Sequence, residues 1–264
     1  MNYVEIAKQI ATEAGLMAKN RMNDEWSIEH KNSNTDIVTE IDRDAETLIK
    51  QRITENYPDH QFLGEEEAFL NQSNHEQTLE GIENIPYLWI VDPIDGTNNF
   101  VQGIQGFNVS IALACYGELI VGVVYDPIID EIFWAEKNKG AYVNQEKISV
   151  SKRDMLRKCV VGASVSANNE QRKIEINSIE SVASQCLSLR ILGSAAINLA
   201  YVAAGRLDAF WHYNLNVWDI AAGALIIKEA GGEITESKGD DYRLNSKAIL
   251  GSNGHIHDTL LNNL

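Results

Sequence analysis

Carboxylate side chains stand at several points of the sequence where a strand or helix is expected to begin or end. Glu65 and Glu66 follow the apolar segment QFLG, Asp92 and Asp95 close the run YLWIV, and Asp219 lies in the first turn of a predicted helix. Each acid alone has an ordinary explanation, because acidic residues are common in turns and favourable at helix N-termini. Together they predict a site, since element ends tend to gather on one edge of a sheet.

Such a cluster of acids requires a positive charge. Two carboxylates about 4 Å apart repel by about 1 kcal/mol in water and by about 4 kcal/mol at the effective dielectric of a protein surface. No matching group of Lys or Arg lies close to these acids in the sequence. Oxygen ligands without His or Cys suit hard cations, so the pattern predicts a site for Mg²⁺ or Mn²⁺.

The segment DPIDGT adds an element that can bind an anion. Pro93 fixes the backbone between the two aspartates, so that the Ile94 carbonyl can also face a cation. Gly96 removes side-chain obstruction, and the amides around it can then point outward and receive a phosphate group. Thr97 would supply a hydroxyl beside the metals. The alternative interpretation of the same residues is a strand that simply ends in a turn.

The composition excludes some classes of function. The chain has 264 residues, 44% of them hydrophobic, and can bury a substantial core. A formal net charge of −16 disfavours a nucleic-acid surface, which needs many Lys and Arg side chains. No apolar run approaches the roughly 18 residues of a membrane span, and the first residues lack the apolar core of a signal peptide. We therefore expect a cytoplasmic protein without nucleic-acid or membrane partners.

The predicted elements place the acids at strand and helix ends. Apolar residues recur at helical spacing in the opening segment and in a second helix that ends at Tyr57-Pro58, and Asp42 lies near the start of that second helix. Residues 107–143 form short β-rich runs typical of an antiparallel meander. In the second half, strand-like runs alternate with helix-like segments at 170–184, 194–204 and 217–230.

The pattern changes near residue 150, where the meander gives way to alternating strands and helices. Because no Pro-, Gly- or Ser-rich linker marks this point, we expect a single unit spanning residues 1–264. Its weak internal lobes would be 1–150, which carries most of the predicted ligands, and 151–264, which carries Asp219.

Four motifs establish a family resemblance. DIVTEID (36–42), GEE (64–66), DPIDGT (92–97) and WDIAAG (218–223) resemble the inositol monophosphatase family, and the likeness covers nearly the whole chain. The resemblance implies the α/β (α+β) class, with a layered α-β-α-β-α sandwich of the inositol monophosphatase and fructose-1,6-bisphosphatase type. It also implies a homodimeric, lithium-sensitive phosphatase that hydrolyses small phosphate monoesters with two or three Mg²⁺ ions.

The resemblance further implies a role for individual residues. The metal ligands would be Glu65, Asp92, Asp95, Asp219 and the carbonyl of Ile94. The residues expected to act in catalysis are Glu65, Glu66, Asp42 and Thr97, the last two hydrogen-bonded to each other and helping to orient a metal-activated water. The substrate-binding residues would be Gly96, Thr97, Gly193, Ser194, Ala195, His212, Asp219 and, from a mobile entry loop, Lys31. No side-chain nucleophile is required.

The motifs leave several substrates open. Inositol 1-phosphate leads, but His212 stands where animal inositol phosphatases carry a glutamate that binds an inositol hydroxyl. His212 can equally be a half-buried neighbour of Trp211 and Tyr213. The alternatives are the 2′-phosphate of NADP(H), adenosine 3′,5′-bisphosphate, fructose 1,6-bisphosphate and histidinol phosphate. A non-catalytic, metal-binding regulatory protein is the alternative from another class, and the chemically intact motifs argue against it.

Overall fold

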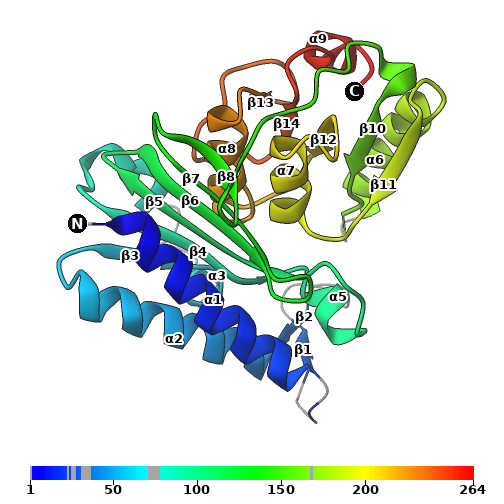
Figure 1. The fold of residues 1–264 in the computed structure, drawn as a ribbon. Helices are drawn as coiled ribbons and strands as arrows, with labels where there is room; N and C mark the ends of the chain where they lie inside the picture. The colour runs from blue at the N-terminus through cyan, green and yellow to red at the C-terminus, as the bar shows by residue number, and fades with distance from the viewer. Residues whose placement is uncertain (1, 23, 25–27, 31–36, 71–77, 167–168) are drawn as a thin grey trace.

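Helical and sheet layers alternate through the molecule (Figure 1). The computed structural model describes residues 2–22, 24, 28–30, 37–70, 78–166 and 169–264. In order, the layers are two long helices, a seven-stranded sheet, two central helices, a five-stranded sheet and two outer helices. This arrangement confirms the α-β-α-β-α sandwich predicted from the sequence. Within the described ranges, no helix is both long and apolar enough to span a membrane.

The first layer consists of α1 (Tyr3–Arg21) and α2 (Glu40–Asn56). Small residues such as Ala7 and Ala14 are fully buried along α1, which lets the helix lie close to the sheet. Thr39 caps α2: its hydroxyl accepts from Ile41 N, and Asp42 accepts from Thr39 N in a capping box. Asp42 thus lies in the first turn of this helix.

The seven-stranded sheet follows the order β3-β4-β5-β6-β7-β8-β9. Only β3 and β4 pair in parallel, and the strands from β4 onward form the antiparallel meander predicted for 107–143. The strands are β3 (Gln61–Gly64), β4 (Leu88–Asp95), β5 (Asn108–Cys115), β6 (Glu118–Asp126), β7 (Glu131–Glu136), β8 (Gly140–Val143) and β9 (Glu146–Ile148).

The central layer consists of α7 (Ala195–Ala203) and α8 (Val217–Glu229). Along β4, Trp89 and Val91 pack against the first helical layer, whereas Leu88 and Ile90 pack against the central one. The strand is buried on both faces and points its C-terminal end at the start of both central helices. The site residues at that end are therefore surrounded by protein.

The five-stranded sheet follows the order β11-β10-β12-β14-β13 and has helices on both faces. Its strands are β10 (Val160–Ala163), β11 (Ser188–Ile191), β12 (Ala209–His212), β13 (Glu233–Glu236) and β14 (Ile249–Ser252). The outer face is covered by α6 (Asn169–Ala183) and α9 (His257–Leu261). The helices predicted at 170–184, 194–204 and 217–230 are confirmed as α6, α7 and α8, whereas β13 and α9 were not predicted.

Short elements complete the chain. The acids that follow β3 form the first turn of a helix, α3 (Glu65–Leu70), where carboxylates are favourable. The other short elements are α5 (Thr97–Val101), β1 (Ile28–His30), β2 (Ile37–Thr39), η1 (Ile82–Asn84) and η2 (Leu156–Lys158).

Candidate active site

The parallel pairing of β3 with β4 brings the first acids together. Gly64 is the register partner of Val91, so the next residues, Glu65 and Asp92, are neighbours at one edge of the sheet. The register between β4 and β5 shifts between Asp92 and Asp95, and this bulge allows both aspartates to be buried. The motif DPID therefore places two carboxylates beside Glu65.

Backbone amides fix two of the carboxylates. Ile94 N donates to Asp92 Oδ1 over 3.0 Å, and Asn216 N donates to Asp219 Oδ2 over 2.7 Å. Asp219 is the third residue of α8, so its bond belongs to a capping box at the start of that helix. One oxygen of each carboxylate is held, and the other can face the neighbouring acids.

Asp95 is fixed by the start of α7. Its Oδ2 accepts from Ser194 Oγ over 2.6 Å and from Ala196 N over 2.7 Å. Ser194 is also the N-cap of α7, where its hydroxyl accepts from Ile197 N. The segment predicted to bind substrate is thus bonded directly to a predicted metal ligand.

The electrostatics show that these acids share one site. Burial and the charges of Glu65, Asp95 and Asp219 raise the pKa of Asp92 well above its usual range. Burial and the charges of Asp95 and Glu65 do the same to the pKa of Asp219. Burial also raises the pKa of Asp95, although the bond from Ser194 opposes the shift. Four carboxylates from three separate segments therefore interact.

This donor set suits a hard divalent cation. All four side chains offer oxygen, and in the described part of the chain no Lys or Arg pairs with Asp92, Asp95 or Asp219. Among the same residues, no three His, Cys, Asp or Glu side chains are placed closely enough to hold a metal ion as they stand. The support for an ion comes from mutually repelling carboxylates, two of them buried and two partly buried, because a cation between the acids would relieve their repulsion.

Thr97 joins the first helical layer to the end of β4. Its Oγ1 lies 3.2 Å from Asp42 Oδ1 and 2.9 Å from the Ile94 carbonyl oxygen. Asp42 is 1% exposed, and its Oδ2 accepts from Thr39 N over 2.8 Å. The Ile94 carbonyl, predicted as a metal ligand, therefore lies beside the hydroxyl predicted to act in catalysis.

Glu46 positions the helix that carries Glu65 and Glu66. Its two carboxylate oxygens accept from Glu66 N and Glu67 N, each over 2.8 Å, and so cap the start of α3. A Cβ on Gly64 would lie 2.3 Å from Glu46 Oε2, so glycine leaves the room that this cap needs. Burial raises the pKa of Glu46 to about 7, although the two amides oppose the shift.

The predicted substrate residues at 193–195 lie against the start of α5. A Cβ on Gly96 would lie 3.4 Å from Ser194 Cβ, and Gly96 itself has φ +89°, a conformation that favours glycine. Asn99 in α5 donates to the Leu192 carbonyl over 2.8 Å. Gly96, Thr97 and the segment Gly193-Ser194-Ala195 are thus brought together.

His212 belongs to a different set of contacts, at the end of β12. It is 7% exposed, and its Nδ1 accepts from Asn214 N over 3.0 Å. The Oε1 of the fully buried Glu175 lies 4.0 Å from the same nitrogen. Burial lowers the pKa of His212, whereas the charge of Glu175 opposes the shift. The ring is therefore neutral near pH 7, with its proton on Nε2.

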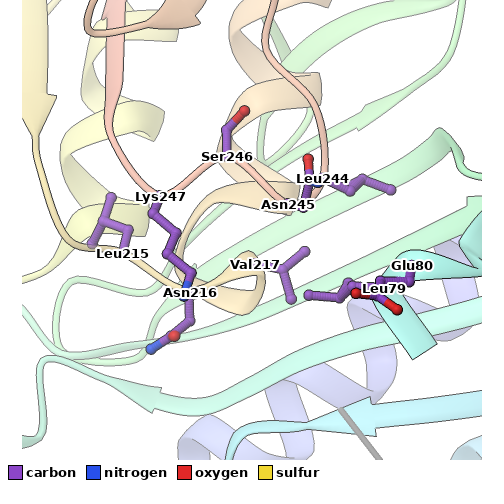
Figure 2. A pocket seen from close by; sticks show the side chains of 9 residues that line it. All are labelled: Leu79, Glu80, Leu215, Asn216, Val217, Leu244, Asn245, Ser246 and Lys247. Carbon is purple, nitrogen blue, oxygen red and sulfur yellow. The ribbon is translucent and has the colours of Figure 1, made fainter. Parts of the chain in front are cut away.

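One cavity lies apart from this cluster, and one predicted residue, Lys31, falls outside the described residues. A cavity of about 370 Å³ lies beside the start of α8, and Figure 2 shows its lining side chains. They are Leu79, Glu80, Leu215, Asn216, Val217, Leu244, Asn245, Ser246 and Lys247. None of the predicted site residues that the structure describes lines this cavity.

Sequence reasoning missed three buried polar residues around the site. Glu46 lies four residues after Asp42 and so on the same face of α2, which is a signal that could have revealed it. Asn108 interrupts an otherwise apolar strand, which is a weaker signal of the same kind. Nothing local marks Glu175, because its partners Ser166 and His212 come from other elements.

The comparisons with known proteins identify the class. A family model described as the inositol monophosphatase family matches residues 2–264. The chain belongs to this family and is a phosphoric monoester hydrolase.

Three relatives show how far the likeness extends. Inositol monophosphatase 2 of Solanum lycopersicum is 38% identical over 99% of this chain and 97% of its own length. A fructose-1,6-bisphosphatase/inositol-1-monophosphatase of Thermotoga maritima is 42% identical over 89% of this chain and 85% of its own. The crystal structure of the extragenic suppressor protein suhB from Bartonella henselae superimposes with a TM-score of 0.89 at 33% identity, covering 100% and 98% of the two chains.

Proposed function

We propose that this protein is a Mg²⁺-dependent phosphomonoesterase that acts on small sugar or polyol phosphates, with inositol 1-phosphate as the leading substrate. The observation that carries the proposal is a group of four mutually repelling carboxylates, the buried Asp92 and Asp95 and the partly buried Glu65 and Asp219, where β4 meets the starts of α3, α7 and α8. Homodimeric assembly, inhibition by Li⁺ and a cytoplasmic location belong to the same proposal through family kinship.

The proposed ligands of the ions are Glu65, Asp92, Asp95, Asp219 and the carbonyl of Ile94. Two or three Mg²⁺ ions, or Mn²⁺ in their place, would bind among these oxygens. When bound, such ions offset the charge of the phosphate group and activate water for attack. The protein's own part is to hold the oxygens in place through the helix starts and the turn of DPID.

The remaining catalytic residues would position water and phosphate. Thr97 would direct its hydroxyl at the attacking water, and the buried Asp42 keeps that hydroxyl oriented. Glu66, whose amide donates to Glu46, would assist them from the first turn of α3. The amides of Gly96 and Thr97 would donate to the phosphate oxygens, because the left-handed conformation of Gly96 turns the chain outward at this point.

The contacts of His212 bear on the leaving group. A neutral imidazole with its proton on Nε2 donates one hydrogen bond, whereas a carboxylate at the same place would accept bonds from substrate hydroxyls. A neutral His212 therefore favours a leaving group that presents an acceptor oxygen to Nε2. At this position inositol would have no carboxylate to accept a bond from its hydroxyl groups. The double name of the Thermotoga relative agrees with a site that admits more than one sugar phosphate.

Release of inorganic phosphate tests the proposal. The substrates to compare are inositol 1-phosphate, fructose 1,6-bisphosphate, NADP(H), adenosine 3′,5′-bisphosphate and histidinol phosphate, each with Mg²⁺ and with EDTA. We expect turnover with Mg²⁺ only, and the highest kcat/KM for inositol 1-phosphate. Asp95→Asn should keep the fold and lose activity by orders of magnitude. Mg²⁺ binding without turnover of any ester would instead favour the regulatory metal-binding protein.

A further inference from the structure

Asn108 is a fully buried polar residue on β5, directly behind Asp95. The two are register partners just after the bulge in β4. Asn108 is 0% exposed, and its Nδ2 donates to Ser194 Oγ over 2.6 Å. The same nitrogen lies 3.5 Å from Asp95 Oδ2 and 3.4 Å from the Asp95 carbonyl. The amide group therefore faces both the carboxylate and the serine that holds it.

Ser194 links Asn108 to the carboxylate. The serine hydroxyl has a single proton, and it donates this proton to Asp95 Oδ2 over 2.6 Å. The bond from Asn108 Nδ2 occupies a lone pair of Ser194 Oγ and so favours the rotamer in which that proton points at Asp95. With Ala196 N, these donors direct Oδ2 toward α7 and turn the second oxygen away from it.

We propose that Asn108 is a positioning residue for Asp95, which acts through Ser194 to hold one carboxylate oxygen toward the divalent ion. The inference rests on the proposed function, because it takes Asp95 as a metal ligand. Partners of this kind commonly change metal affinity by about 10- to 100-fold when they are removed.

The carbonyl oxygen of the Asn108 side chain, which has no partner in the described part of the chain, shows that this residue does more than fill space in the core. Asn108 Oδ1 is buried and has no hydrogen-bond donor among the described residues. If the amide were rotated to exchange its two ends, the carbonyl oxygen would face the acceptor Asp95 Oδ2. The orientation is therefore set by what Nδ2 does for Ser194 and Asp95, at the cost of leaving Oδ1 unpaired.

Asn253 provides a matched control. It is also a buried asparagine, and its Nδ2 donates to Ser151 Oγ and to the Arg153 carbonyl, each over 2.9 Å. Its Oδ1 accepts from His255 N over 3.0 Å. These contacts lie at the end of β14 and involve none of the predicted ligands. Asn253→Ala therefore removes a comparable set of bonds away from the site.

The test measures the binding of Mg²⁺ or Mn²⁺ alone by calorimetry, without substrate, in the full-length protein. We expect Asn108→Ala to weaken the affinity by about 10-fold, whereas Asn253→Ala leaves it unchanged. Activity should follow the same order: Asn108→Ala should need more Mg²⁺ for half-maximal rate, and its kcat and substrate KM should return to wild-type values at saturating Mg²⁺. A purely structural role would lower the melting temperature without this dependence on Mg²⁺.

A second variant covers the case in which Asn108→Ala does not fold. Ser194→Ala removes the same link from its other end, and it should weaken Mg²⁺ binding similarly. Where both single variants fold, the double variant should bind Mg²⁺ no more weakly than the worse of the two, because the residues act in series. Unchanged affinity in every folded variant, or an equal loss in Asn253→Ala, overturns the inference.

Asp95→Asn separates this inference from the proposed function. If Asp95→Asn loses Mg²⁺ binding while Asn108→Ala and Ser194→Ala keep it, only the positioning role fails. If Asp95→Asn binds Mg²⁺ like the wild type, or if the wild type binds no divalent ion, the metal assignment itself fails and the positioning role fails with it.

Discussion

Gly64→Ala should disturb the site without touching any predicted ligand. The added Cβ would lie 2.3 Å from Glu46 Oε2, 2.5 Å from Glu46 Cδ and 2.7 Å from Phe62 Cε1. Real Cβ atoms essentially never approach other atoms so closely, so at least one side chain must move. Because Glu46 is held by Glu66 N and Glu67 N, moving its carboxylate uncaps α3.

The magnitude follows from two terms. Loss of a helix cap costs about 0.5–2 kcal/mol, and an added methyl group in a packed interior costs about 1–3 kcal/mol. Their sum, roughly 1.5–5 kcal/mol in the free energy of unfolding, corresponds to a fall of about 3–20 °C in melting temperature for a chain of this size. Activity should fall as well, because α3 begins with Glu65 and Glu66.

Thermal unfolding and phosphate release, measured on the same variants, test this reasoning. Glu46→Asp shortens the acid by one methylene group, so in the Gly64→Ala background it should recover part of the lost stability. Phe62→Leu removes the other close contact and serves as the control, which should recover less. A melting temperature for Gly64→Ala equal to that of the wild type, or rescue by Phe62→Leu alone, would show that Glu46 does not set the position of α3.

Three further outcomes can be measured. Thr97→Val should keep its melting temperature and lose about 10²- to 10⁴-fold in kcat, because Asp42 no longer orients a hydroxyl; a kcat near that of the wild type would remove Thr97 from catalysis. Burial lowers the pKa of His257, so stability present above about pH 6.5 is lost as the pH falls and the unfolded chain takes up the proton. His257→Gln should therefore show a smaller fall in melting temperature between pH 7.5 and 5.5 than the wild type does, and equal slopes would contradict the assignment. His212→Glu should shift relative kcat/KM toward inositol 1-phosphate, with His212→Gln as the uncharged control, and an unchanged ranking would place His212 outside the substrate site.

The layered fold could be predicted because the motifs and the hydrophobic pattern agree along the chain. The run YLWIV is uniformly apolar, as expected for a strand covered on both faces, and β4 is buried along its whole length. Helix starts were recognisable where a capping residue stands before an apolar segment, as Ser194 does before α7. The division into lobes at 1–150 and 151–264 stays a prediction.

The mutual arrangement of the site could not be predicted from spacing alone. Asp42 and Thr97 are 55 residues apart, and only the packing of α2 on the sheet brings them within a hydrogen bond. The pairing of Glu65 with Asp92 depends on the register of β3 and β4, which a single sequence leaves undetermined. The roles of Glu46 and Asn108 also depend on helix packing and strand register, because their hydrogen-bond partners lie on other elements.

Three helix starts stabilise the acids before any cation binds. Asp42 lies in the first turn of α2, Asp219 lies in the first turn of α8, and Asp95 accepts from Ala196 N at the start of α7. The amides there carry the positive end of each helix dipole, which favours the charged form of a carboxylate. Each of these acids therefore has one carboxylate oxygen bonded to a backbone amide. In Asp95 and Asp219, the second oxygen is the one that can contact a cation.

In the described residues, Asp92, Asp95 and Asp219 have no Lys or Arg partner. Hydrogen bonds from amides at the helix starts explain how the chain can still hold these acids close together. The helix starts offset part of the charge and fix the geometry, and a divalent ion would neutralise the remainder. Removing a capping donor should then change how tightly the ion binds more than it changes the global stability, because the ion senses the orientation of each free oxygen. Ser194→Ala, which removes the N-cap of α7, tests this when its Mg²⁺ affinity and its melting temperature are measured together.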